Sequence, residues 1–349
     1  MELPCPDLEQ ALPFFIGVLG FSLVSIFPAD APQTAVLQGY GLRLRLQHDA
    51  TGTPGVLRLY CDDLPACVAG KSRLIAPNGT VIELLQADAP LTLPALVPSF
   101  VISRVADDDG FAAGRAGMQY RDLIPGRQGG RFIASHIRIE QGGPVPDYVH
   151  YHKVGFQLIF CYKGWVRVVY EDQGPPFVLQ AGDCVLQPPQ IRHRVLESSD
   201  GLEVIELSCP AEHETLVEHQ LELPTAAVNA AREFSGQRFV RHEAGTAEWQ
   251  AWRLDGFAAR DAGLAAGSGG AVSAQVVRPA GENRSAAGTH SGELQFWFVQ
   301  RGRLELERPG SESEVLAAGA ACVIPAGMPH ALAHCSDDLE FLEIIVPAR

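Results

Sequence analysis

One spaced pattern of histidine, glutamine, glycine and proline occurs twice in this chain, and it constrains the fold more than any other feature of the sequence. The first copy comprises His150, His152, Gln157, Gly164, Gly182, Pro188 and His193. The second copy comprises His290, Gln295, Gly302, Gly319, Pro325, Gly327 and His330. Within each half of the pattern the spacing is the same in both copies, so the sequence predicts two related domains in tandem.

Short alternating segments, broken by glycine and proline turns, surround both copies of the pattern. The chain has 35 Gly and 25 Pro in 349 residues, a composition that favours short strands over long helices. Such segments are typical of a β-sandwich or β-barrel. We therefore predict a mostly β protein with its first barrel over residues 131–210 and its second over residues 271–349.

The segments that flank the first barrel are predicted to be connections. Residues 91–130 are rich in Pro, Asp, Gly and Arg and are interpreted as a linker. Residues 211–270 are expected to connect the two barrels and to be partly helical, because residues 213–234 contain helix-compatible pieces.

Three histidines of the first copy form a candidate metal site. His150 and His152 are two residues apart, so on a strand both imidazoles project from the same face. His193 is delivered by a later hairpin. If these faces point into a barrel, three imidazoles converge. Such a facial set suits a divalent transition metal, Fe(II), Mn, Ni, Cu or Zn, and leaves positions open for substrate and oxygen.

These motifs resemble those of the cupin family. Its first motif places HxH before a Glu and a Gly, matched here by His150, His152, Gln157 and Gly164. Its second motif is matched by Gly182, Pro188 and His193, with Gln190 where the family has a second Gly. The resemblance implies a bicupin: two tandem double-stranded β-helix (jelly-roll) barrels, the first with its metal held by His150, His152, Gln157 and His193.

Gln157 departs from the family pattern, which has Glu at this position. An amide oxygen is a neutral ligand, so a divalent ion would keep a charge of +2 rather than +1 and would be a stronger Lewis acid. Alternatively, Gln157 does not ligate, and the site resembles the three-histidine Fe(II) sites of cupin-fold thiol and β-diketone dioxygenases.

The second copy of the pattern has lost one histidine, because Gly288 stands where His150 stands in the first copy. The candidate set is His290, Gln295 and His330, with Glu293 or His334 as possible substitutes for the missing ligand. Two histidines can hold zinc if a carboxylate joins them. A degenerate barrel kept for packing is the interpretation we favour.

Candidates for substrate binding lie beside the first site. Tyr162 belongs to a group of aromatic residues around the motif, which could line a pocket or fill a core. Arg192 and Arg194 flank His193, and either could pair with a substrate carboxylate if it pointed inward. The alternative is that both arginines are exposed.

Residues 1–90 form a separate α+β module in this interpretation. Asp7 is a plausible N-cap before a helix that ends at Gly20, and strand-like runs follow. The stretches PDLEQALPFFIGVLGFSL and APNGTVIELL resemble parts of the vicinal oxygen chelate (glyoxalase-like) superfamily. That family binds metals at strand positions, of which only Glu83 is matched here. The expectation is a degenerate glyoxalase-like module, structural or ligand-gating, without its own metal.

Charge and hydropathy exclude several classes of partner. The formal net charge is −14, without a basic run to offset it, which argues against nucleic-acid binding. No apolar run reaches the ~18 residues of a membrane span, and the start does not read as a signal peptide. Eight cysteines include no CxxC pair, so we expect reduced thiols in a cytoplasmic protein. Exposed edge strands of tandem barrels often pair, and we expect a homodimer.

The function expected from these features is that of a metal-dependent enzyme acting on a small oxygen-rich or anionic organic molecule. With Fe(II), the expected chemistry is that of a dioxygenase. Without redox chemistry, the same site could serve an isomerase or lyase. From a different class, the alternative is a non-catalytic bicupin that binds or senses a small molecule.

Overall fold

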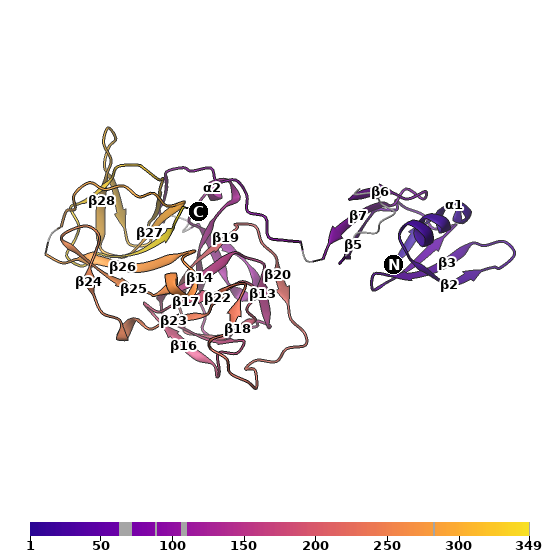
Figure 1. Cartoon of the computed structure of the whole chain (residues 1–349), viewed down its shortest axis with the longest axis horizontal. Coiled ribbons are helices and arrows are strands. Elements are labelled where there is room, and N and C mark those ends of the chain that lie inside the picture. The colour runs from indigo at the N-terminus through magenta and orange to yellow at the C-terminus, as the bar shows by residue number, and fades with distance from the viewer. Residues whose placement is uncertain (63–71, 88, 106–109, 282, 349) are drawn as a thin grey trace. The chain divides into compact units, whose positions relative to one another are not determined.

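The computed structural model describes residues 1–62, 72–87, 89–105, 110–281 and 283–348, and the chain divides into two units, Met1–Pro90 and Leu91–Arg349 (Figure 1). The great majority of the regular structure is strand. Among the described residues, no helix is both long and apolar enough to cross a membrane. The predicted fold class, mostly β, is confirmed.

The first unit contains a short helix and two small sheets. Its first sheet has the order β1-β4-β3-β2, with β1 parallel to β4, and its second has the order β5-β7-β6. The strands are β1 (Glu2–Pro4), β2 (Ser22–Phe27), β3 (Thr34–Gly39), β4 (Leu42–Gln47), β5 (Val56–Cys61), β6 (Arg73–Ile75) and β7 (Val81–Gln86).

The predicted helix of this unit is confirmed, with a change of form along its length. It runs as α1 (Leu8–Pro13) and continues as a π-helix over Phe14–Val18. The carboxylate of Asp7 accepts a hydrogen bond from the backbone N–H of Gln10, 3.0 Å away, which satisfies one of the free donors of the first turn. Phe15 is fully buried in the core between the helix and the sheets.

Glu83, the possible metal ligand of this unit, lies on β7. Its carboxylate forms an ion pair with the guanidinium of Arg58 on β5, at 2.8 Å. A glyoxalase-like origin of the unit, and its structural or gating role, stay predictions.

The first barrel of the second unit consists of two sheets that share one hydrophobic core. The larger sheet has the order β23-β17-β14-β19-β11-β10-β9, and the smaller has the order β16-β15-β18-β13-β20, with β12 beside β18. The strands are β9 (Ala112–Ala113), β10 (Gln119–Asp122), β11 (Ile133–Ile139), β12 (Gly143–Pro144), β13 (His150–His152), β14 (Phe156–Lys163), β15 (Trp165–Tyr170), β16 (Phe177–Gln180), β17 (Cys184–Gln187), β18 (His193–Ser198), β19 (Leu202–Cys209), β20 (Thr215–Val217) and β23 (Val240–His242).

The second barrel repeats this plan with a smaller second sheet. Its large sheet has the order β24-β25-β26-β32-β27-β30-β8, and its small sheet has the order β29-β28-β31. The strands are β8 (Val101–Ser103), β24 (Gln250–Ala251), β25 (Phe257–Asp261), β26 (Ser273–Pro279), β27 (Leu294–Arg301), β28 (Arg303–Glu307), β29 (Glu314–Ala317), β30 (Ala321–Ile324), β31 (Ala331–Ala333) and β32 (Glu340–Val346). Outside the barrel sheets lie β21 (Glu233–Phe234), β22 (Gln237–Arg238), α2 (Arg127–Gly130) and α3 (Leu264–Gly267).

The interpretation of residues 91–130 as a linker was wrong. Strand β8, which precedes the first barrel in the chain, pairs with β30 of the second barrel. Strand β23, which precedes the second barrel, pairs in the same way with β17 of the first. Each barrel thus receives an edge strand from the segment that leads into the other. The turn-forming composition of these segments conceals strands of two to four residues, because so short a strand shows no periodicity.

The helical interpretation of residues 213–234 was also wrong. The segment is mostly irregular and contributes the short strand β20 to the edge of β13, where Thr215 lies opposite His152. Backbone pairing with an open sheet edge outweighs the weak helical preference of this stretch. Within residues 211–270, helical turns occur only at Ala244–Thr246 and Leu264–Gly267.

Side chains alternate along β14 and decide what faces the first barrel's interior. Phe156, Leu158 and Phe160 are fully buried in a core shared with Phe296 and Phe298 of β27, so the two large sheets pack on each other. The residues between them face inward, and among these is the buried Gln157.

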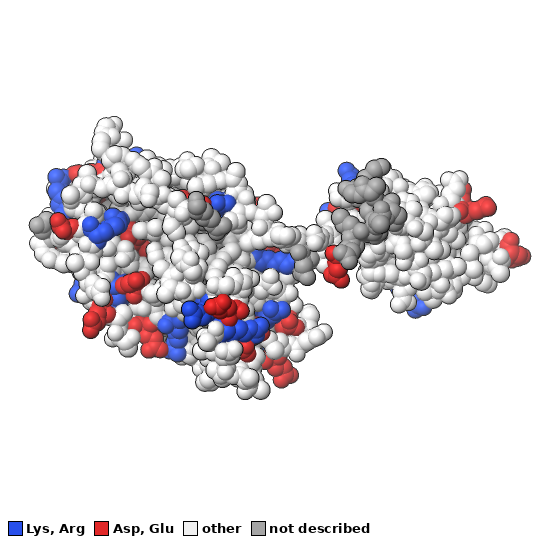
Figure 2. All heavy atoms as spheres, viewed as in Figure 1, with Lys and Arg blue, Asp and Glu red and all other residues white. Residues whose placement is uncertain are grey.

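On the face seen in Figure 2, acidic and basic side chains of this unit are interspersed.

Candidate metal centre

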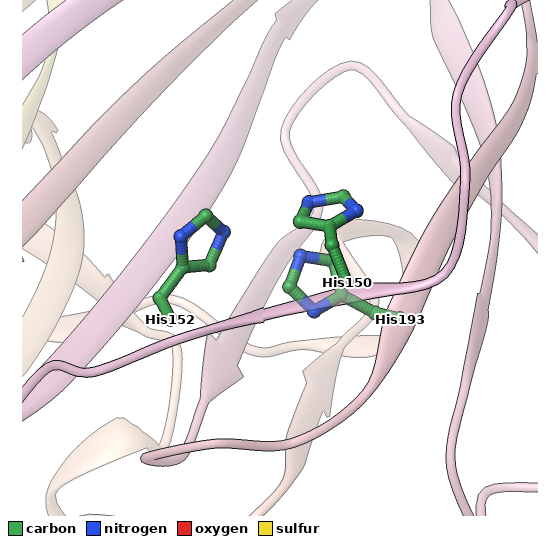
Figure 3. Close-up of side chains that lie close together, drawn as sticks. All are labelled: His150, His152 and His193. Atoms are coloured by element: carbon green, nitrogen blue, oxygen red, sulfur yellow. The ribbon is translucent and has the colours of Figure 1, made fainter. Parts of the chain in front are cut away.

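Two neighbouring strands of the small sheet bring three histidines together inside the first barrel (Figure 3). His150 and His152 lie on β13, and His193 begins β18 directly opposite His150. One nitrogen atom from each ring lies within 4.8 Å of those of the other two, and all three side chains are buried. Residues far apart in sequence therefore form the cluster that the HxH spacing and the later His predicted.

Hydrogen bonds fix the tautomer of two of these rings. The Nδ1–H of His150 donates to the backbone oxygen of Tyr148 at 2.8 Å, and that of His193 donates to the oxygen of Ile191 at 3.0 Å. A carbonyl oxygen can only accept, so the proton resides on Nδ1 and the lone pair on Nε2. His152 is held in another way, with its Nδ1 3.0 Å from the hydroxyl oxygen of Thr215 on β20.

Burial keeps all three rings neutral. Burial lowers the pKa of His150, and the adjacent Arg115 lowers it further, against the effect of Asp147. Burial and the neighbouring rings of His150 and His213 lower the pKa of His152 to about 2, and burial likewise lowers that of His193. The nitrogen that ligates a metal must carry no proton, and a neutral imidazole has one such nitrogen. These three rings can therefore bind a metal at neutral pH.

Two charged residues that the sequence did not reveal adjoin the cluster. Arg115 extends from a 3-10 turn between β9 and β10, and its Nη1 lies 2.7 Å from Oδ1 of Asp147. Its Nη2 donates to Nε2 of His150 at 2.8 Å. The side chain of Asp147 is fully buried, and its other oxygen accepts the backbone N–H of Val195 at 3.0 Å.

The cluster forms the polar end of a small cavity of about 80 Å³ inside the barrel. The polar lining also includes Arg115, Tyr170, Gln187 and Glu206. The remaining walls are apolar and consist of Met118, Tyr120, Ile137, Ile139, Ile159, Val166, Val168, Leu179, Val195, Leu202 and Val204. The cavity therefore suits a small ligand with one polar head and an apolar body.

Gln157 and Glu206 form a hydrogen-bonded pair between β14 and β19. Burial raises the pKa of Glu206, against the opposing effects of His213, Gln157 and Arg115. The amide oxygen Oε1 of Gln157 is buried and has no hydrogen-bond partner. A buried acceptor without a partner fits a metal or ligand group at this position. Whether Gln157 is the fourth ligand or a hydrogen-bond partner stays a prediction.

The three substrate-binding candidates do not reach the cavity. Tyr162 points from β14 to the core between the barrels, where its hydroxyl donates to the backbone oxygen of Gln300 at 2.9 Å. Arg192 stacks on Tyr151, its guanidinium carbon 4.2 Å from the ring centroid, and lies 3.6 Å from the carboxylate of Glu218. Arg194 is exposed. Alternation along the strands turns all three away from the histidines, so these assignments were wrong.

The second barrel does not assemble a comparable set. His330 is buried with Nε2 unpartnered, while Nε2 of His290 is 2.7 Å from the backbone oxygen of Ile324. No group of three His, Cys, Asp or Glu ligands forms there in the described part of the chain. Neither Glu293 nor His334 replaces the missing ligand, because Glu293 forms an ion pair with Arg131 at 3.0 Å and His334 is exposed.

A buried carboxylate fills the interior of the second barrel instead. Glu343 accepts hydrogen bonds from the side chains of Trp252, Arg253, Gln275, Gln295 and Trp297. Burial raises the pKa of Glu343, but Arg253 and these donors outweigh it and hold the pKa below its usual value. Gln295, a candidate ligand, is thus engaged by Glu343, as Gln157 is by Glu206. A buried cluster of hydrogen-bonded polar side chains therefore occupies the interior of the second barrel.

Comparison with known proteins identifies both barrels. Residues 135–207 and 275–345 each match the family model of the cupin domain. The chain therefore contains two tandem cupin domains, as the motif spacing predicted. Among curated proteins, none matches the sequence.

Solved structures with the same fold are similar to this chain over about three quarters of its length. YlbA of E. coli has a TM-score of 0.54 at 11% identity and covers 73% of this chain and 94% of its own. A variant of oxalate decarboxylase from Bacillus subtilis has a TM-score of 0.53 at 14% identity, covering 74% and 79%. Salicylate 1,2-dioxygenase from Pseudaminobacter salicylatoxidans has a TM-score of 0.53 at 15% identity, covering 73% and 86%. At these identities the similarity establishes the tandem fold.

Proposed function

We propose that the first cupin domain is a metal-dependent enzyme domain that acts on a small oxygen-rich organic molecule. The observation that carries the proposal is the cluster of three neutral imidazoles, His150, His152 and His193, which line a mostly apolar cavity. Three histidines with open positions form a ligand set for Fe(II), Mn, Ni, Cu or Zn. The metal would be one of these divalent transition metals.

Each part of the cavity has a defined task in this proposal. A divalent ion supplies Lewis acidity and, in the case of iron, redox chemistry with dioxygen. The backbone carbonyls of Tyr148 and Ile191 orient His150 and His193. The apolar walls exclude water from the bound molecule. The carboxylate of Glu206, with its raised pKa, can hold or accept a proton beside the ligand.

Dioxygenase chemistry is the reaction we place first. The site offers three neutral imidazoles, and any carboxylate would have to come from outside the two cupin motifs. Salicylate 1,2-dioxygenase, named above, shares the tandem fold, which supports this choice by analogy only. Two other readings of the site have to be tested beside it: an isomerase or lyase that needs no dioxygen, and a binding or sensing protein without turnover.

Metal analysis and oxygen uptake test the proposal together. The purified protein should contain about one equivalent of a transition metal per chain, and His152→Ala should lose it while His290→Ala, in the second barrel, should retain it. With a panel of small hydroxy- and oxo-acids, the iron-loaded protein should consume dioxygen only when His152 is intact. Turnover under anaerobic conditions would indicate the isomerase or lyase. Binding of a panel member without any turnover would indicate the sensing protein.

A further inference from the structure

Arg115 lies at the cavity and makes hydrogen bonds to two side chains. Its Nη1 is held by Asp147 at 2.7 Å, and Asp147 is itself buried and fixed by the backbone N–H of Val195. Its Nη2 donates to Nε2 of His150 at 2.8 Å. The first bond joins opposite charges, with the carboxylate fully buried and the arginine side chain 33% exposed, while the second joins a charge to a neutral ring.

The bond to His150 and a metal on the same ring exclude each other. The Nδ1 of His150 carries its proton, which it donates to the oxygen of Tyr148, so Nε2 offers a single lone pair. That lone pair can accept a hydrogen bond from Arg115 or ligate a metal. A metal at the histidine cluster therefore releases Nη2, while the ion pair with Asp147 keeps the guanidinium at the cavity wall.

We infer that Arg115 is the receptor for a carboxylate group of the ligand, which brings that group beside the three histidines. This inference rests on the proposed metal function. The released Nη2 is a charge-assisted donor suited to a carboxylate oxygen. Since the rest of the cavity is mostly apolar, the ligand is a small monocarboxylate with a compact apolar body.

The charge balance of the site agrees with a negatively charged ligand. A divalent ion and Arg115 bring three positive charges, whereas Asp147 and Glu206 bring at most two negative ones. Buried positive charge without compensation is costly, and a surplus of at least one positive charge remains, so an anionic ligand stabilises the site.

The second barrel contains the same arrangement with the carboxylate already in place. Arg253 stands two residues after β24, as Arg115 stands two residues after β9, so the two arginines occupy corresponding positions. Arg253 forms an ion pair with the buried carboxylate of Glu343. In the first barrel, the strand position of Glu343 is taken by Glu206, which lines the cavity. An external carboxylate at Arg115 would reproduce the pairing that the second barrel makes internally.

Two measurements on Arg115→Gln test the inference, with Arg192→Gln as a matched control outside the cavity. The first is the affinity for Zn²⁺ or Co²⁺ in competition with a chelator. Because the substitution removes both a competitor for His150 and a positive charge, metal should bind at least as tightly as in the wild type. A residue with a purely structural role would weaken metal binding when replaced.

The second measurement is the binding of butanoate, hexanoate and benzoate to the metal-loaded protein, followed by calorimetry, with butanamide as the neutral probe. The wild type and Arg192→Gln should bind the carboxylates and not the amide, and Arg115→Gln should bind them at least about 10-fold more weakly. Arg115→Lys, which keeps the charge, should fall between. If neither Arg115 variant folds, the preference of the wild type for carboxylate over amide decides.

The outcomes separate this inference from the proposed function. A wild-type protein that binds no metal would overturn the proposed function. A metal-loaded wild type that binds none of the carboxylates, or binds amide equally well, would overturn the role of Arg115 alone. So would equal carboxylate affinity in Arg115→Gln, or weaker metal binding in that variant.

Discussion

Gly288 pairs with His330 across an isolated β-bridge in the second barrel, at the place where His150 pairs with His193 in the first. The backbone relationship is the same, but one side of it has no side chain. A barrel of this kind therefore forms without the imidazole at that position. This supports a binding role, and not a folding role, for the histidine at this position of the first barrel.

The substitution His150→Gly should transfer the second barrel's arrangement to the first. We expect a folded protein that has lost metal affinity by at least about 100-fold, because a ligand is removed and its position is left without a donor. Equilibrium dialysis against Zn²⁺ measures the affinity, and circular dichroism checks the fold. Unchanged metal affinity would mean that the three-histidine assignment is wrong.

Thr215 should act on metal binding through His152. In Thr215→Val the Nδ1 of His152 loses its partner, and we expect metal affinity to fall about 10- to 100-fold. Thr215→Ser keeps the hydroxyl and should restore most of the affinity. Chelator competition measures both variants. Equal losses in the two would indicate that packing of β20, and not the hydroxyl, holds the ring.

The stability of the metal-stripped protein should fall as the pH drops below about 6.5. The pKa values of His150, His152 and His193 are lowered in the folded protein, so below that pH the unfolded chain binds more protons and unfolding is favoured. Each such histidine adds a slope of up to about 1.4 kcal/mol per pH unit. Denaturation of the wild type and of His152→Gln from pH 7 to 5 should show a shallower slope in the variant; parallel slopes would contradict the argument.

Two matched carboxylates should respond differently to the loss of their charge. Glu343→Gln leaves Arg253 beside a neutral amide in a buried site, and we expect about 3–5 kcal/mol of destabilisation. Glu206→Gln replaces a carboxylate that lines the cavity, and we expect less than about 1 kcal/mol. Urea denaturation compares the two. A larger loss in Glu206→Gln would show that Glu206 has a mainly structural role.

The parts of the site that the sequence predicted are those with fixed local spacing. His150 and His152 share a strand face, and the second motif brings His193 to the neighbouring strand. The two-residue period of a strand and the motif spacing were therefore enough to predict the histidine cluster. The same periodicity contradicts the role assigned to Tyr162. It lies five residues after Gln157, and an odd separation on one strand places two side chains on opposite faces.

Arg115 could not be predicted from the motifs, because it lies in a turn more than thirty residues before them. The feature that identifies Arg115 is a second arginine in the other half of the same chain. Arg253 occupies the corresponding turn of the second barrel, but the strands that define both turns have only two residues and leave no pattern in the sequence. Only the three-dimensional repeat aligns the two arginines.

The exchange of β8 and β23 gives the segment before the second barrel a structural role in the first barrel. Strand β23 lies in the chain just before that barrel and seals the edge of β17, whose Gln187 lines the cavity and donates to the hydroxyl of Tyr170 at 2.7 Å. Strand β8 reciprocates at the other barrel. Each half thus completes a sheet of the other, so we expect that neither barrel keeps its full sheet when it is expressed without its partner.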